Sequence, residues 1–193
     1  MSDEHEDIEG PPPEAYSRIT NPDRFAPLHD DALNLLSRLS AEFDVQRSEG
    51  YGLDPELERA DLARQTVQLV PANPASASLT FVFTTFPSVN LRCGRLMVET
   101  FPCCGCDACG ETAASEGKRL HAVIDEVVHG HFREEITIPW LGRASQKFEL
   151  GTLGSPNGLR KGGVSLERLR ARALVRGGTR SWQWAPWPTR HLR

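Results

Sequence analysis

Four of the five cysteines in this 193-residue chain lie within seven residues, and they are the side chains most able to do chemistry. Cys106 and Cys109 form a C-x-x-C pair, a spacing that lets two thiolates turn towards one metal ion. Cys104 adds a third sulfur across Gly105, and glycine tolerates the backbone conformations that such a tight turn requires. The pattern therefore predicts a metal site in this loop.

Zinc is the metal that the pattern favours, because zinc prefers four ligands in a tetrahedron and binds thiolate sulfur at about 2.3 Å. We expect one zinc ion per chain, held by Cys104, Cys106 and Cys109. The candidates for the fourth ligand are Cys103, Cys93 and His121. Cys103 is the weakest of them, because adjacent cysteines seldom both bind one ion well. An iron–sulfur cluster also takes thiolates, but its familiar spacings place two residues between successive cysteines.

Two other interpretations of the same loop stay open. The Cys106–Cys109 pair has the spacing of thiol redox sites and precedes an expected helix, whose N-terminus lowers the pKa of a nearby thiol. The redox motif usually occurs in a βαβ setting, which the order of elements here does not provide. Alternatively, the cysteines act as small hydrophobic side chains in a reduced, partly buried turn.

The remaining polar groups form no recognisable catalytic arrangement. His129 and His131 could offer two imidazoles to a metal, but residues two apart point to different sides of a helix unless the helix ends there. No serine lies in a nucleophile-elbow context, and the segment 151–155 lacks the lysine of a phosphate loop. We therefore expect a binding or interaction protein rather than an enzyme, with a protein partner that the sequence does not identify.

The charge of the chain is divided between its two ends. Residues 1–63 have a net charge of −11, whereas residues 160–193 have a net charge of +8 and contain Trp182, Trp184 and Trp187. The basic side chains of that segment are Arg160, Lys161, Arg168, Arg170, Arg172, Arg176, Arg180, Arg190 and Arg193. Arginines beside aromatic rings are typical of nucleic-acid binding. The simpler interpretation is a final strand with buried tryptophans on one face and solvated arginines on the other.

Hydrophobic periodicity predicts the elements that must position the cysteine loop. Apolar residues recur at helical spacing over residues 27–43 and 112–132, and short alternating runs mark strands between and after these helices. The expected strands cover residues 66–70, 79–85, 89–93, 96–100, 136–138 and 146–150. Short connections favour an antiparallel meander. The expected fold is α+β, with both helices on one face of the sheet and the cysteine loop between a strand and the second helix.

Composition and local sequence divide the chain into three parts. Residues 1–14 are acidic and poor in apolar side chains, which predicts a disordered tail. Residues 15–150 form the expected domain, with the cysteine loop at 101–110, and residues 151–193 form a glycine-linked basic extension that packs on or beside it. The acidic N-terminus does not resemble a secretory signal, and no apolar run is long enough to span a membrane. A cytoplasmic location is therefore expected.

The cysteine loop also resembles a family of uncharacterised actinobacterial proteins with the signature Phe-Pro-x-Cys-Gly-Cys-Asp-Ala-Cys. Cys104, Cys106 and Cys109 match its cysteines, and Cys103 occupies its variable position. Further similarity covers residues 16–25 and 70–72 and the dipeptide Trp187-Pro188. The resemblance extends over about residues 15–150 and implies a coherent domain, but it implies no activity.

Overall fold

The computed structural model describes residues 11–58, 63–140, 144–153 and 177–190. The first helix, α1, spans Pro27–Glu42 and begins at a proline, whose fixed φ suits the first turn of a helix. Its buried side chains, Leu28, Ala32, Leu35, Leu36 and Leu39, share one face at helical spacing. The helix predicted over residues 27–43 is therefore confirmed to within one residue.

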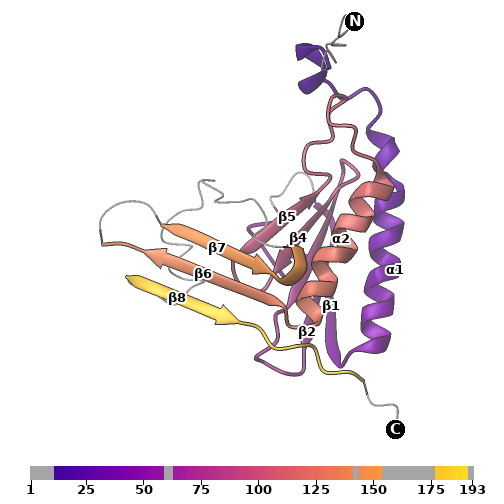
Figure 1. The fold of residues 1–193 in the computed structure, drawn as a ribbon. Helices are drawn as coiled ribbons and strands as arrows, with labels where there is room; N and C mark the ends of the chain where they lie inside the picture. Colours follow the sequence, from indigo (N-terminus) through magenta and orange to yellow (C-terminus); the bar gives the residue numbers. More distant parts are fainter. Residues whose placement is uncertain (1–10, 59–62, 141–143, 154–176, 191–193) are drawn as a thin grey trace, which may run out of the picture.

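Five consecutive strands follow α1 and form one antiparallel meander (Figure 1). They are β1 (Val45–Glu49), β2 (Ala63–Pro71), β3 (Leu79–Thr84), β4 (Val89–Cys93) and β5 (Met97–Phe101). The pairing places Val67, Phe81 and Leu91 side by side across β2, β3 and β4, and all three are fully buried. This row packs into the same core as the leucines of α1. The first strand, β1, is an element that the sequence analysis did not predict.

The second helix, α2, spans Ala113–Val128 and begins at a capping box. The Thr112 hydroxyl accepts from the Ser115 amide at 3.1 Å, and the Ser115 hydroxyl accepts from the Thr112 amide at 3.0 Å. These bonds satisfy two backbone donors that would otherwise lack partners at a helix N-terminus. Helices α1 and α2 contact each other and lie together on one face of the five-stranded sheet (Figure 1). The α+β fold, with the cysteine loop between β5 and α2, is thus as expected.

A second, three-stranded sheet follows α2, and it is the main departure from the expected single meander. It contains β6 (Phe132–Ile138), β7 (Ser145–Leu150) and β8 (Gly178–Gln183), with β6 in the centre. Side chains of β6 alternate between buried and more exposed positions, so that Phe132, Glu134, Ile136 and Ile138 face inward. The late strand β8 pairs with β6 rather than extending the meander, and this pairing closes a separate sheet beside the first (Figure 1).

Buried polar groups join the second sheet to the first. The Glu134 carboxylate of β6 is fully buried and accepts from the amides of Arg95 and Leu96, each at 2.8 Å, in the turn between β4 and β5. The indole N–H of Trp184 donates to the same carboxylate at 3.1 Å. Burial raises the pKa of Glu134, and the hydrogen bonds oppose that shift.

The chain after β8 returns to the main core. Trp187 is 3% exposed, packs edge-on against Phe43 and donates from its indole N–H to the Ala77 carbonyl at 2.8 Å. The Asp44 amide donates to the Pro188 carbonyl at 2.8 Å, beside the start of β1. The described part of the C-terminal extension therefore packs on the domain. None of the helices in the described ranges is long and apolar enough to cross a membrane.

Candidate metal centre

The cysteine loop connects the end of β5 at Phe101 to the start of α2 at Ala113. The sulfur atoms of Cys104, Cys106 and Cys109 all lie within 4.8 Å of one another. The Sγ atoms of Cys106 and Cys109 are 3.2 Å apart. Cys106 is 3% exposed, whereas Cys104 and Cys109 are exposed. The fold thus gathers three thiols into one cluster that opens to solvent on one side.

This spacing of sulfur atoms suits a metal ion. Two thiolates bound to one tetrahedral zinc at about 2.3 Å are roughly 3.8 Å apart. The Cys106 and Cys109 sulfurs are 3.2 Å apart, and no pair in the cluster is more than 4.8 Å apart, so small rotations of the exposed Cys104 and Cys109 side chains would bring the sulfurs to this spacing. Three thiolates also belong to the soft ligand class that zinc, copper(I) and iron–sulfur clusters prefer. The donor set therefore fits zinc and leaves one coordination position for another group.

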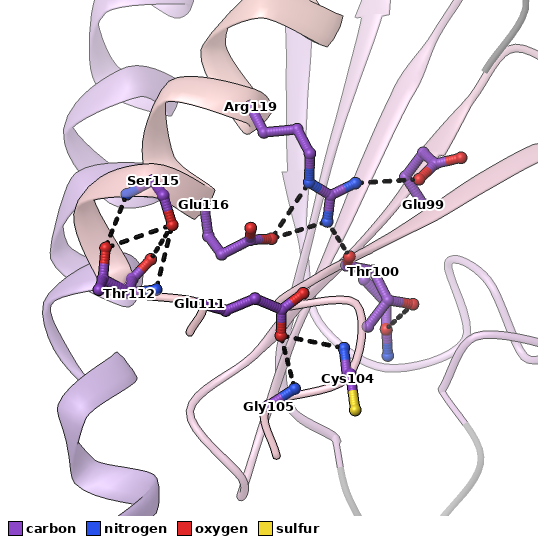
Figure 2. A network of polar contacts seen from close by, with 10 residues as sticks. Glu99, Thr100, Cys104, Gly105, Glu111, Thr112, Ser115, Glu116 and Arg119 are labelled. Atoms are coloured by element: carbon purple, nitrogen blue, oxygen red, sulfur yellow. Dashed lines mark hydrogen bonds and ion pairs between the residues drawn. The ribbon is translucent and has the colours of Figure 1, made fainter. Parts of the chain in front are cut away.

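The backbone of the loop is held from the side of α2 by Glu111. Its carboxylate accepts from the amides of Cys104 at 3.2 Å and Gly105 at 2.7 Å (Figure 2). Gly105 has a φ of +75°, and a Cβ there would lie 2.9 Å from the ring of Phe86. A side chain at this position would be both strained and crowded, so the turn between Cys104 and Cys106 requires glycine.

The opposite side of the loop is held by the segment before α1. The Asp107 carboxylate accepts from the Thr20 hydroxyl at 2.6 Å and amide at 3.0 Å, and from Arg18 at 3.2 Å and Arg24 at 3.3 Å. Arg24 also donates to the carbonyls of Gly105 at 2.9 Å and Cys106 at 3.0 Å. The Thr20 hydrogen bonds, more than the arginines, hold the pKa of Asp107 well below its usual range.

Sequence reasoning did not identify the residues that anchor the loop. Thr20 and Arg24 lie more than eighty residues before Asp107, and no periodicity connects them to the cysteines. Asp107, between Cys106 and Cys109, is the signal that could have pointed to Thr20 and Arg24. A carboxylate in a tight turn of cysteines needs hydrogen-bond donors from elsewhere in the chain. The stretch 16–25, noted above only for its family resemblance, contains these donors.

The thiols of Cys106 and Cys109 differ in their affinity for a proton. Hydrogen bonds from Cys104 and Cys109 lower the pKa of Cys106, because they stabilise its thiolate. The corresponding bonds with Cys106 and Cys104 raise the pKa of Cys109 to about 12. Cys106 therefore loses its proton more readily than Cys109 does. A metal ion at the centre would take the place of the protons that the three sulfurs share.

Cys93, one candidate for the fourth ligand, does not lie near the cluster. It is fully buried at the end of β4, where it pairs with Met97, while the loop leaves β5 after Phe101, opposite Val89. Four residues of extended strand separate these positions, which is roughly 13 Å. Burial raises the pKa of Cys93 well above that of an ordinary thiol. This cysteine packs in the hydrophobic core.

His121, the other candidate, contacts Asp31 and does not belong to the cluster. Its Nε2 lies 3.1 Å from Oδ1 of Asp31, on the wall of a groove of about 720 Å³ between α1 and α2. Cys103 is exposed, and its sulfur does not join the group of three. Across the described ranges, no further cysteine, histidine or carboxylate supplies a fourth ligand.

Arg119 of α2 ties together the two elements that flank the loop (Figure 2). Its guanidinium donates to Glu116 at 2.7 Å, to Glu99 at 3.2 Å and to the carbonyl of Thr100 at 2.5 Å. The same group lies 4.1 Å from the centre of the Phe101 ring. The end of β5 and the first turns of α2 are therefore fixed relative to each other, which defines the span that the cysteine loop must cross.

Of the nine basic C-terminal residues, only Arg180 and Arg190 lie in the described ranges. The other seven lie outside them. Trp184 and Trp187 are buried, and Trp182 is partly buried with the guanidinium groups of Arg95 and Arg180 within 6 Å of its ring. Two of the three tryptophans are thus part of the core. The possibility of nucleic-acid binding rests on the sequence alone.

Comparisons with known proteins place the chain in a family without assigning a reaction. No curated protein and no solved structure matches it. One family model does match, and it covers residues 2–191, which is nearly the whole chain. The extent of this match agrees with the return of the C-terminal segment to the core. The chain belongs to a family of unknown function, DUF6226.

Proposed function

We propose that this protein is a small cytoplasmic interaction protein whose cysteine loop holds one zinc ion, with Cys104, Cys106 and Cys109 as ligands. The observation that carries the proposal is the approach of their three sulfur atoms to within 4.8 Å of one another. A loop anchored on one side by Glu111 and on the other by Asp107 supports it, because a pre-organised backbone reduces the entropy lost on binding the ion.

The proposed role of the ion is structural. The loop joins β5 to α2, and bonds to zinc would fix this connection in addition to the hydrogen bonds described above. Because the unfolded chain lacks a formed site, the free energy of metal binding would add directly to the free energy of folding. A water molecule or a group from a partner protein would fill the fourth position. Three clustered thiols favour zinc over an iron–sulfur cluster held by four cysteines.

Metal content of the purified chain tests the proposal. We expect about one zinc per chain after anaerobic preparation, a lower melting temperature after chelation, and loss of zinc in Cys106→Ser. Cys103→Ser is the matched control, because it removes the neighbouring thiol that lies outside the group of three. It should retain zinc and melt like the natural chain. Equal zinc content in both variants would refute the assignment of ligands.

A second candidate is a thiol redox sensor, and the 3.2 Å separation between the Cys106 and Cys109 sulfurs favours it. Oxidation of this pair by hydrogen peroxide would remove two electrons and two protons, form one S–S bond and yield two water molecules. The lowered pKa of Cys106 would make it the attacking thiolate.

Thiol labelling separates the two candidates. A sensor should react fastest at Cys106 at neutral pH, and peroxide should convert the Cys106–Cys109 pair to a disulfide with release of any bound metal. Slow labelling at all three cysteines, with zinc retained in the presence of peroxide, would support the structural role instead. Mass spectrometry of alkylated peptides distinguishes these outcomes residue by residue.

A further inference from the structure

The turn that follows α2 carries two histidines that the proposed zinc site does not use. Helix α2 ends at Val128, and Gly130 has a φ of +80°, so the chain reverses direction between His129 and His131. Both side chains are exposed, and their rings lie nearly parallel, with centroids 6.3 Å apart and planes inclined by 25°. The objection that residues two apart diverge on a helix does not apply here, because the helix has ended.

Hydrogen bonds fix which nitrogen of each ring carries a proton. Nδ1 of His129 lies 2.7 Å from the carbonyl oxygen of Asp125, and Nδ1 of His131 lies 2.9 Å from Oε2 of Glu126. A carbonyl and a carboxylate oxygen can only accept, so each Nδ1 is the donor. In the neutral form of each ring, Nε2 therefore presents a lone pair. This is the form of histidine that binds metals, with an oxygen acceptor that orients the ring from behind.

The backbone that carries the two rings is held from several directions. The His131 amide donates to the Glu126 carbonyl at 2.9 Å, and the Gly151 amide donates to the His131 carbonyl at 2.9 Å. Gly130 packs so closely on the C-terminal segment that a Cβ there would lie 2.6 Å from the Pro186 nitrogen. The Gln183 side chain donates to the Gly130 carbonyl at 3.1 Å. The two imidazoles thus stand on a fixed turn.

The distance between the rings allows one ion to bind both. Two imidazoles bound on opposite sides of an ion through bonds of roughly 2.1 Å have ring centres about 6.4 Å apart. The observed 6.3 Å between the stacked rings lies within this limit, and rotation of the two exposed side chains would turn both Nε2 atoms towards one ion. The carbonyl groups at the C-terminal end of α2 also give this region a negative potential, which favours a cation.

We propose that His129 and His131 form a second metal site, which takes a borderline divalent transition ion such as Ni²⁺, Cu²⁺ or Zn²⁺ through their Nε2 atoms. Imidazole nitrogen suits these ions, and affinity rises towards copper in the usual order for divalent metals. The site is separate from the thiolate cluster. Helix α2, with 16 residues and a length of about 24 Å, lies between the two.

Ni²⁺ is the probe for the test. The full chain is used with zinc bound to it, or as purified if it contains no zinc. Isothermal titration at neutral pH should detect Ni²⁺ binding, and His129→Gln or His131→Gln should each weaken it at least tenfold. His121→Gln is the matched control, because His121 is also bonded to an oxygen acceptor but stands apart from this turn. It should bind Ni²⁺ like the natural chain.

Paramagnetic broadening locates the ion independently of affinity. Ni²⁺ should broaden the nuclear magnetic resonance signals of residues 129–131 before those of the cysteine loop. Unchanged Ni²⁺ binding in the double variant His129→Gln/His131→Gln, or no binding by the natural chain, would overturn the proposal. Loss of Ni²⁺ binding in Cys106→Ser with retention in the histidine variants would overturn it too, because the ion would then occupy the thiolates. Both histidines are exposed, so the variants should fold.

Discussion

Asp107 shows how one side chain can hold a cysteine loop in place without contributing a thiol. It stands between two proposed ligands, and its carboxylate is turned towards Thr20, Arg18 and Arg24 rather than towards the sulfurs. Loss of a group that orients metal ligands typically weakens metal binding by about 10- to 100-fold. The position of Cys106 and Cys109 therefore depends on a residue that contributes no ligand atom.

Replacement of Asp107 by asparagine should weaken zinc binding by roughly 10- to 100-fold, the range found for such supporting groups. The asparagine amide has one acceptor oxygen instead of two and carries no negative charge. It therefore cannot accept from all of the donors that bind Asp107, and the turn should loosen. Competition with a chromogenic chelator measures the change. Asp125→Asn is the control, because Asp125 is exposed and pairs with Arg38 only at 3.9 Å. Equal affinity in the two variants would mean that Asp107 does not position the ligands.

Asp107 also makes the loop sensitive to acid. Its pKa in the folded chain lies below the ordinary value of 3.8, so its ionised form favours folding. The resulting stability is present above about pH 4 and disappears as the pH falls through the lowered pKa. Thermal unfolding between pH 5 and pH 2 should therefore decline less steeply in Asp107→Asn than in the natural chain. Parallel curves would contradict this account.

At the scale of elements, the helices and most strands could be predicted because their signals are local. The leucines of α1 recur at helical spacing, and the strands of the meander are joined by short turns. The second sheet could not be predicted in the same way, because the paired residues of β6 and β8 lie 40 to 50 positions apart in the chain. Nothing in the local sequence of residues 178–183 identifies β6 as their partner.

The candidate site shows the same division between local and distant signals. The C-x-x-C spacing is visible in the sequence, and the structure does bring Cys104 to this pair. The fourth ligand could not be decided from spacing, because Cys93 and His121 are close in sequence but face the core and the groove. Their directions depend on strand register and helix phase, which are set by packing.

Glu134 holds two elements together as Asp107 holds the cysteine loop. Its carboxylate joins β6 to the turn between β4 and β5. Glu134→Ala removes the acceptor of the Arg95 and Leu96 amides and of the Trp184 indole, and the last two of these donors are buried. Unsatisfied buried donors cost about 1–3 kcal/mol each, so the free energy of unfolding should fall by about 2 kcal/mol or more. Chemical denaturation measures it.

The pKa of Glu134 adds a second, independent readout. Burial raises this pKa in the folded chain, so the folded state holds a proton more tightly than the unfolded state. The contribution of Glu134 to stability is therefore largest below about pH 4.5 and declines as the pH rises through the raised value. Glu134→Ala should remove this decline. If the decline persists in the variant, another group is responsible for it.

At the scale of the whole molecule, the C-terminal segment closes the fold. Trp187 fills the core next to Phe43, the Pro188 carbonyl accepts from the Asp44 amide, and the Arg190 amide donates to the Glu42 carbonyl at the end of α1. Residues 187–190 therefore pack beside the junction between α1 and β1. The family model, which covers residues 2–191, includes this segment.

Truncation of this anchor should be costly. Trp187→Ala removes a buried ring and an indole donor, and we expect a loss of about 3–5 kcal/mol in the free energy of unfolding. Trp140→Ala is the matched control, because Trp140 is 94% exposed. A surface change of this kind should alter stability by about 0.5 kcal/mol or less. Similar losses in both variants would show that the C-terminal segment does not complete the core.

The central claim is that three thiolates of one loop hold one metal ion, and X-ray absorption at the zinc edge tests it most directly. The anaerobically prepared full chain should show three sulfur neighbours at about 2.3 Å and one lighter atom, nitrogen or oxygen, at about 2.0 Å. Absence of bound metal, or a bound ion with no sulfur neighbours, would contradict the account. Four sulfur neighbours would contradict the open fourth position.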